Sequence, residues 1–150
     1  MIALGSDHAG YRLKNEIIDH LNAKRIAYKD YGTHNGERCD SADIARDPLR
    51  AVQSGEAKQA ILICGTGIGM SIIANKHKGI RAAVCTNVFA ARHTRLHNNA
   101  NTMCLGARVT GTGLALELVD VFLGTGFLGG RYQQRLDKLQ AIEDSERNNA

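Results

Sequence analysis

The sequence predicts a single α/β domain of the Rossmann-like type, with a five-stranded parallel sheet and helices on both faces. Its 150 residues suit one domain with a substantial core. Short apolar runs alternate along the chain with longer amphipathic runs, which is the pattern of parallel β-α-β units. A glycine-rich turn follows the most apolar run, as turns often do at the carboxyl end of a parallel strand. We expect the domain to cover residues 1–144, and residues 145–150 to form a frayed tail.

Five apolar runs are expected to form the strands. Each is rich in aliphatic residues and is bounded by glycine or by polar residues, as the strands of a buried parallel sheet are. The second run is the weakest and leads into a polar loop. In chain order, the strands are expected at residues 2–5, 26–30, 60–64, 80–85 and 102–106.

The segments between the strands are expected to be helices. In the first, Leu13, Ile17 and Leu21 recur at intervals of four, so their side chains share one face. The second contains Pro48, the only proline, and a proline in a helix interior costs about 3 kcal/mol. Asp47 as the cap would avoid that cost, so this helix is expected to begin late or to kink. In chain order, the helices are expected at residues 11–24, 42–54, 67–75, 87–97, 113–123 and 130–143.

Composition argues against several classes of protein. The net charge of +4 and the pI near 9.0 would suit nucleic acid, but the aromatic content is 5% and basic residues do not interleave with aromatic ones. We therefore expect no nucleic-acid partner. The chain shows neither a membrane-length apolar run nor a basic leader, so we expect a cytoplasmic protein with no membrane partner. The four cysteines are widely spaced and form no zinc-type motif, which indicates reduced thiols and no metal site.

The segment 61–71 carries the strongest functional signal, because an apolar strand leads into Cys64 and then into a glycine-rich turn. The strand would deliver the thiol to the carboxyl edge of the sheet, and the N-terminus of the next helix would favour a thiolate. The N–H groups of the turn could form a nest for an oxyanion. The alternative is a buried cysteine above an ordinary turn, since free cysteine is often buried. The turn consists of Gly65, Thr66, Gly67, Ile68 and Gly69.

Polar side chains at other element ends could join this site. Asp7 and His8 follow the first strand and could bind polar groups of a substrate, or Asp7 could cap the next helix. His97, followed by Asn98, ends the fourth helix. This histidine could act as a general acid or base, or could be a terminal residue favoured by the helix dipole. Arg108 adds a cation after the fifth strand.

Arg131 and Arg135 form a further candidate site near the C-terminus. They are four residues apart, so they share one face of the last helix. Two guanidinium groups suit an anion such as phosphate, which arginine can bind in a bidentate manner. For an isolated pair of this kind, a solvated helix face is the better explanation.

Two common nucleotide sites do not fit this sequence. A dinucleotide site needs G-x-G-x-x-G and an acidic residue at the end of the next strand, but that strand ends in Cys85-Thr86-Asn87. A P-loop needs a lysine directly after its last glycine, and Lys76 comes too late. The remaining thiol, nest, histidine and arginines suit proton transfer beside a carbonyl in a small phosphorylated molecule. We expect this chemistry to need no cofactor and no metal.

Six sequence blocks occur in a specific order along the chain. They are Gly-Ser-Asp-His-Ala-Gly at 5–10, Ile-Cys-Gly-Thr-Gly-Ile-Gly-Met-Ser at 63–71, Ala-Asn-Lys at 74–76 with Gly-Ile-Arg-Ala-Ala at 79–83, His-Asn-Asn-Ala-Asn at 97–101, Leu-Gly-Ala-Arg-Val at 105–109 and Gly-Gly-Arg-Tyr-Gln-Gln-Arg at 129–135. Together they resemble type B ribose-5-phosphate isomerase, a family that also includes galactose-6-phosphate isomerase subunits. The resemblance extends over almost the whole chain.

The resemblance implies an aldose–ketose isomerase that interconverts D-ribose 5-phosphate and D-ribulose 5-phosphate through an enediolate. It implies that Cys64 is the base, that His97 opens the furanose ring, and that Thr66 lies near the developing negative oxygen. The backbone of residues 65–69 would hold that oxygen. The resemblance also implies homodimers or dimers of dimers whose active sites draw residues from two chains. The implied substrate ligands are Asp7 and Asn98 for hydroxyl groups, and His8, Arg108, Arg131 and Arg135 for phosphate.

Two departures from the family pattern bear on the substrate. Members commonly have Asp-Tyr-Pro-Asp before the second helix, whereas this chain has Ser41 and Ala42 in place of the tyrosine and proline. The arginine motif usually has histidine where Tyr132 stands here. Both changes leave the implied chemistry intact and leave open whether the sugar is a pentose or a hexose phosphate of the allose or galactose type. A further alternative is a phosphosugar-binding module without catalytic activity.

Overall fold

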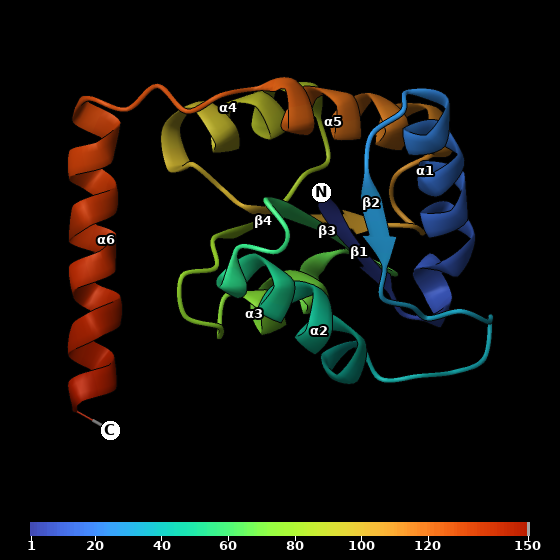
Figure 1. Cartoon of the computed structure of the whole chain (residues 1–150), viewed down its shortest axis with the longest axis horizontal. Helices are drawn as coiled ribbons and strands as arrows, with labels where there is room; N and C mark the ends of the chain where they lie inside the picture. The colour runs from blue at the N-terminus through green and yellow to red at the C-terminus, as the bar shows by residue number, and fades with distance from the viewer. Residues whose placement is uncertain (150) are drawn as a thin grey trace.

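The computed structural model describes residues 1–149 and has the predicted five-stranded parallel sheet (Figure 1). The strand order is β2-β1-β3-β5-β4, and every neighbouring pair is parallel. The three central strands agree closely with the predicted ranges, whereas β2 and β4 at the two edges are shorter than predicted. The strands are β1 Ile2–Ser6, β2 Tyr28–Asp30, β3 Gln59–Cys64, β4 Ala82–Val84 and β5 Thr102–Gly106.

Helices cover both faces of the sheet, as predicted. One layer contains α1, α4 and α5, whose buried residues share a core with alternate residues of the strands. The opposite layer contains α2 and α3. Figure 1 shows these two layers, and α6 standing at the side of the molecule away from α1. The helices are η1 His8–Gly10, α1 Tyr11–Ala23, α2 Ser41–Ser54, α3 Ile68–Ala74, α4 Val88–Asn98, α5 Thr112–Gly124 and α6 Arg131–Asn148.

The central strand β3 is buried along its whole length, because both of its faces are covered. Ile61 and Ile63 pack against the layer of α1 and α5. Leu62 and Cys64 point to the opposite face and pack against α2 and α3. The continuous apolar run that predicted this strand therefore reflects burial on two sides. It also fixes the side of the sheet on which the Cys64 thiol lies.

The helix that contains Pro48 begins earlier than predicted. Its N-cap is Asp40, whose side chain accepts a hydrogen bond from the N–H of Ala42, and not Asp47. Pro48 lies inside the helix and is buried. Its ring comes so close to β1 that a Cβ on Gly5 would lie 3.2 Å from the proline Cγ. Burial of the ring against this glycine offsets part of the cost of the missing backbone hydrogen bond.

The last helix continues past the predicted end at residue 143. Residues 145–148, predicted to belong to a frayed tail, are helical, and Ala150 lies outside the described residues. Ser145 donates a hydrogen bond to the carbonyl of Ile142, and Arg147 pairs with Glu143 one turn earlier. These local contacts extend the helix by one turn. No helix within residues 1–149 is long and apolar enough to cross a membrane.

Candidate active site

The topology brings the carboxyl ends of β1, β3 and β5 together. After β1, the chain adds β2 on one side and β3 on the other, so the strand order reverses between β1 and β3. In open α/β sheets, ligands bind at the carboxyl ends of the strands at such a switch point. In the register of the sheet, Ser6 pairs with Ile63, and Cys64 pairs with Gly106. The segments that follow these strands therefore share one edge. We call the residues there the carboxyl-edge group: Asp7, His8, Cys64, Gly65, Thr66, Gly67, Ile68, Gly69 and Arg108.

The thiol of Cys64 is almost buried at the start of the glycine-rich turn. Its residue is 5% exposed, and the N–H of Gly67 donates a hydrogen bond to Sγ over 3.1 Å. Gly67 is the N-cap of α3 and has a φ of 80°, a left-handed conformation that glycine adopts without strain. The N–H of Gly67 therefore holds the sulfur atom against the start of the turn.

The turn is held by the segment that follows β5. The N–H of Ala107 donates to the carbonyl of Cys64 over 2.8 Å, and the N–H of Arg108 donates to that of Gly65 over 3.0 Å. The side chain of Arg108 lies over the turn, with Nη1 3.5 Å from where a Cβ on Gly65 would be. The hydroxyl of Thr66 accepts from the N–H of Ile68 and is exposed at the edge. One cation and the predicted nest therefore face the same space.

Gly106 allows this close contact between β5 and the turn. A Cβ built on Gly106 would lie 2.6 Å from both the carbonyl carbon and the oxygen of Thr66. We predict that Gly106→Ala displaces the turn and lowers the free energy of unfolding by about 1–3 kcal/mol. Activity should fall as well, because the backbone beside Cys64 moves. Chemical denaturation checks the first effect.

Gly113→Ala is the matched control for this prediction. Gly113 lies in α5 with nothing within 4 Å of its Cβ position. Because alanine is the better helix former, the variant should be more stable by about 0.5–1 kcal/mol. Equal stability changes in the two variants would contradict the close approach at Gly106.

Asp7 caps η1, as one of its two interpretations proposed, and also reaches a residue of α2. Its Oδ1 accepts from the N–H groups of Ala9 and Gly10, and its Oδ2 accepts from the hydroxyl of Ser41 over 2.8 Å. Asp7 is only 7% exposed. A carboxylate offers about four acceptor positions, so one remains for a further donor. Sequence reasoning did not find the contact with Ser41, because the two residues are far apart in the chain.

His8 follows Asp7 and is fixed by the loop before α2. The N–H of Cys39 points at Nδ1 of His8 over 3.4 Å. Because a backbone N–H can only donate, this nitrogen acts as the acceptor, and Nε2 carries the proton of the neutral ring. That proton is available to an anionic ligand at the carboxyl edge.

The other predicted site residues lie near the amino ends of the strands, which we call the amino edge of the sheet. The helix α4 starts after β4, runs back along the sheet and ends just before β5 begins at Thr102. Thr102 pairs with Ala60, four residues before Cys64, so this edge is about 13 Å from the thiol along the strands. We call the residues beside it the His97 group: His97, Asn98, Arg131, Tyr132 and Arg135.

Hydrogen bonds lock the end of α4 at this amino edge. The N–H of Asn101 donates to the carbonyl of Arg81, and the Arg81 guanidinium donates twice to the carbonyl of Asn99. Buried Arg95 donates to the carbonyl of Ala100. The carboxyl ends of the strands therefore gather only part of the predicted site. Within one chain, His97 does not lie beside Cys64.

The His97 group is built around an aromatic stack between α4 and α6. The rings of His97 and Tyr132 are nearly parallel, with centroids 4.2 Å apart, and His93 meets His97 edge-on at 5.0 Å. Arg131 and Arg135 lie over the Tyr132 ring. Partial burial, followed by the positive charges of His93 and the two arginines, lowers the pKa of His97. The imidazole is therefore neutral at pH 7.

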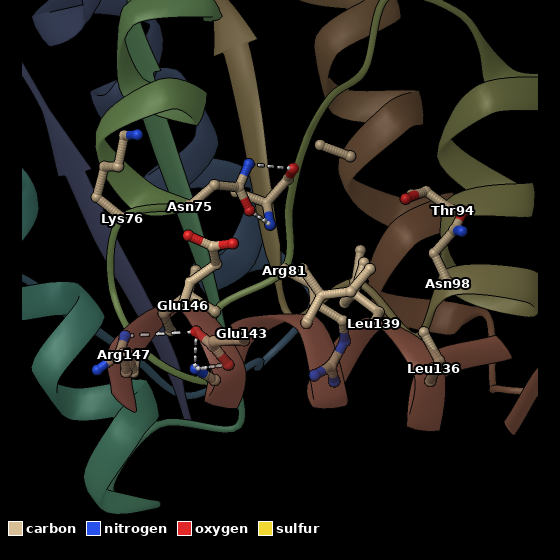
Figure 2. Close-up of a pocket in the computed structure, with 16 residues that line it drawn as sticks. Asn75, Lys76, Arg81, Thr94, Asn98, Leu136, Leu139, Glu143, Glu146 and Arg147 are labelled. Carbon is tan, nitrogen blue, oxygen red and sulfur yellow. Dashed lines mark hydrogen bonds and ion pairs between the residues drawn. The ribbon is translucent and has the colours of Figure 1, made fainter. Parts of the chain in front are cut away.

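A groove separates α6 from the amino edge of the sheet. Its volume is about 780 Å³, and it is lined on α6 by Leu136, Leu139 and Ile142. Figure 2 shows Leu136 and Leu139 facing Asn98 of α4 across this space. At the other end, Glu143 accepts from the N–H of Gly79 and ties α6 to the loop before β4. On its α6 side, the groove thus presents apolar side chains next to the His97 group, and charged residues such as Glu143 and Arg147 line its other end.

Comparison with known proteins gives a consistent result. The family model described as Ribose/Galactose Isomerase matches residues 2–139. Ribose-5-phosphate isomerase B of Escherichia coli is 46% identical over 95% of each chain. The solved structure of ribose-5-phosphate isomerase B from Clostridium thermocellum has a TM-score of 0.95 and 50% identity, covering 97% of this chain and 98% of that one.

A second solved structure contains a ligand. It is ribose-5-phosphate isomerase B from Mycoplasma genitalium with bound ribulose-5-phosphate, at 37% identity and a TM-score of 0.91, covering 95% of each chain. The sequence matches extend over both the carboxyl-edge group and the His97 group. With its fold and nearly its whole length matched, this chain belongs to the ribose/galactose isomerase family.

Proposed function

We propose that this protein interconverts D-ribose 5-phosphate and D-ribulose 5-phosphate. The observation that carries the proposal is the Cys64 thiol, whose sulfur accepts a hydrogen bond from the Gly67 N–H. It lies at the carboxyl edge, where open α/β sheets bind ligands, in a fold shared with the ribose-5-phosphate isomerases. The test is an assay of the purified protein on both pentose phosphates. Absence of interconversion in either direction would refute the proposal.

In the proposed mechanism Cys64 moves one proton between two neighbouring carbons. The thiolate takes the proton from C2 of open-chain ribose 5-phosphate, and the electrons of that C–H bond form a C1–C2 double bond as negative charge reaches O1. The hydroxyl of Thr66 and the N–H groups of the turn would stabilise the enediolate. Among these N–H groups, those of Gly67 and Ile68 already have partners within the turn. The proton of the O2 hydroxyl then moves to O1, which becomes the C1 hydroxyl. The thiol returns the carbon-bound proton to C1, and O2 becomes the ketone oxygen. No net oxidation occurs.

We propose that His97 opens the ring before this step. Neutral imidazole takes the proton from O1 of the furanose, the C1–O4 bond breaks as the aldehyde forms, and O4 receives the proton. The lowered pKa of His97 supports this assignment, because its base form persists to a lower pH than that of an ordinary histidine. Ribulose 5-phosphate cannot form the corresponding ring, since its O5 carries the phosphate. Only the aldose therefore needs this step.

The remaining polar residues are proposed to bind substrate. Asp7, with one free acceptor position, and Asn98, exposed beside His97, would bind hydroxyl groups. Phosphate would be bound by His8, Arg108, Arg131 and Arg135. All three of these arginines are exposed at their respective edges, which supports contact with a charged ligand.

We predict that replacing both Arg131 and Arg135 by alanine raises KM for ribose 5-phosphate by roughly ten- to a hundredfold, because two charged phosphate contacts are lost. The change in kcat should be smaller. Steady-state kinetics measure both values. Arg46→Ala is the control, since Arg46 is an exposed arginine on α2 whose one ion pair within residues 1–149 is with Asp47. An unchanged KM in the double variant would contradict the phosphate assignment.

We further propose that each active site combines two chains in a homodimer or a dimer of dimers. Cys64 and His97 lie at opposite edges of one sheet, so a second copy must bring its His97 group to the carboxyl-edge group. Exposed apolar side chains support such an assembly, including Ile68 and Ile72 on α3 and Leu139 on α6. The apolar side chains that α6 contributes to the groove add to this surface.

A hexose 6-phosphate is the second candidate substrate. Ser41 supports it, because this small side chain contacts Asp7 at a point where relatives commonly carry a tyrosine, which leaves more room at the sugar. The test is a panel of ribose, allose and galactose phosphates. A binding module without activity would instead bind a sugar phosphate without exchanging its C1 or C2 proton for solvent deuterium.

We also propose a cytoplasmic location, which the four free thiols support.

A further inference from the structure

Tyr132 contacts three of the residues to which we assign a role. Its ring stacks on His97 at 4.2 Å with only 7° between the planes. Its hydroxyl accepts a hydrogen bond from Nη2 of Arg131 over 3.0 Å. The guanidinium carbons of Arg131 and Arg135 lie 5.0 and 5.4 Å from its ring centroid. One half-buried phenol therefore lies at the centre of the His97 group.

These contacts also connect two helices that share little other packing. Phe89, His93 and His97 form a row of rings along α4, and Tyr132 at the start of α6 completes it. His93 is held by its Nδ1, which lies 2.9 Å from the carbonyl of Phe89. On its other face, His97 contacts only Tyr132 among the rings of residues 1–149. Loss of Tyr132 would free that face of the imidazole.

The electrostatics of the group give the phenol a second task. Arg131 and Arg135 bring two positive charges close to each other and to His97. Neither arginine forms an ion pair within residues 1–149. The negative face of an aromatic ring attracts guanidinium groups. The Tyr132 ring can therefore hold both arginines near the imidazole in the absence of phosphate.

We infer that Tyr132 is a positioning residue, which holds the imidazole of His97 for ring opening through its ring and holds Arg131 for phosphate through its hydroxyl. This inference rests on the proposed function. The ring and the hydroxyl of Tyr132 then have separate effects. The ring acts on a step that only ribose 5-phosphate requires, whereas the hydroxyl acts on a contact that both pentose phosphates require.

Two variants separate these effects. Tyr132→Leu removes the ring, so kcat for ribose 5-phosphate should fall about three- to tenfold more than kcat for ribulose 5-phosphate, in line with the loss of a stacked pair. Tyr132→Phe keeps the ring, so the ratio of the two kcat values should stay that of the unmodified protein. KM should rise about threefold or more for both substrates in Tyr132→Phe, since one hydrogen bond from a charged group is lost. Gln134→Leu, an exposed change on the same turn of α6, is the matched control.

The pH profile of kcat tests the role of the Tyr132 ring independently. The groups that face His97 are His93 on α4, and Arg131, Tyr132 and Arg135 on α6. Without the ring, water reaches the imidazole and the arginines are less constrained. The pKa of His97 should then rise, so that its base form is lost at a higher pH. The acid limb of kcat for ribose 5-phosphate should therefore move to higher pH in Tyr132→Leu, and remain in place in Tyr132→Phe.

The outcomes distinguish this inference from the proposed function. An unmodified protein that isomerises neither pentose phosphate refutes the function, and the positioning role with it. An active protein in which Tyr132→Leu lowers both kcat values equally, with an unmoved acid limb, refutes the positioning role alone. A selective loss for ribose 5-phosphate in Tyr132→Leu, absent from Tyr132→Phe and Gln134→Leu, supports it. Proton NMR of the His97 ring checks that both variants are folded. It also checks that the stack is kept in Tyr132→Phe and lost in Tyr132→Leu.

Discussion

Replacing Cys64 by alanine is expected to reduce the interconversion of ribose 5-phosphate and ribulose 5-phosphate by roughly a thousandfold, as the loss of a positioned base does. Both directions should be affected equally, because the same thiol would serve both. Exchange of the C1 or C2 proton with solvent deuterium should disappear as well. Steady-state assays and NMR of the substrate in deuterium oxide measure these effects. Full activity in the variant would remove the thiol from the mechanism.

Cys85→Ala is the matched control for the loss of a thiol. Cys85 is buried just after β4, where burial raises its pKa to about 11. Such a thiol stays protonated at neutral pH and cannot act as a base. The variant should lose some stability and keep its activity. If both cysteine variants lost activity to the same extent, a structural role for the two thiols would explain the result better than catalysis.

Replacing His97 by alanine is expected to impair the two directions unequally. Turnover of ribose 5-phosphate should fall by roughly a hundredfold or more, since the variant can use only the small fraction of sugar that is already open. Turnover of ribulose 5-phosphate should change much less, because this ketose is an open chain in solution. The two initial rates, measured on the same preparation, check the prediction. Equal losses in both directions would contradict a role in ring opening.

The parts of the fold that depend on local pattern could be predicted from the sequence. The apolar run ending at Cys64 predicted a doubly buried strand and the edge at which its thiol lies, and the structure confirms both. Asn87 caps α4, and its side chain accepts from the N–H of Ala90. Caps, strand periodicity and glycine turns are local, so a single sequence carries them.

Contacts between distant segments could not be predicted in the same way. The position of Pro48 inside α2 depends on the room left by Gly5 on β1. The hydrogen bond from Ser41 to Asp7 and the stack of Tyr132 on His97 each join different elements. No spacing rule relates such pairs. The separation of His97 from Cys64 became visible only once the direction of α4 along the sheet was known.

The most direct test of a two-chain active site is complementation between two variants that are each expected to turn over ribose 5-phosphate poorly. Cys64→Ala and His97→Ala subunits are mixed under conditions that exchange subunits, and turnover of ribose 5-phosphate is measured in the mixed dimers. Half of the dimers are then mixed, and each has one site with both residues intact, so we predict recovery of about a quarter of the unmodified activity. Activity in verified mixed dimers that does not exceed that of the two parent variants would contradict a site built from two chains.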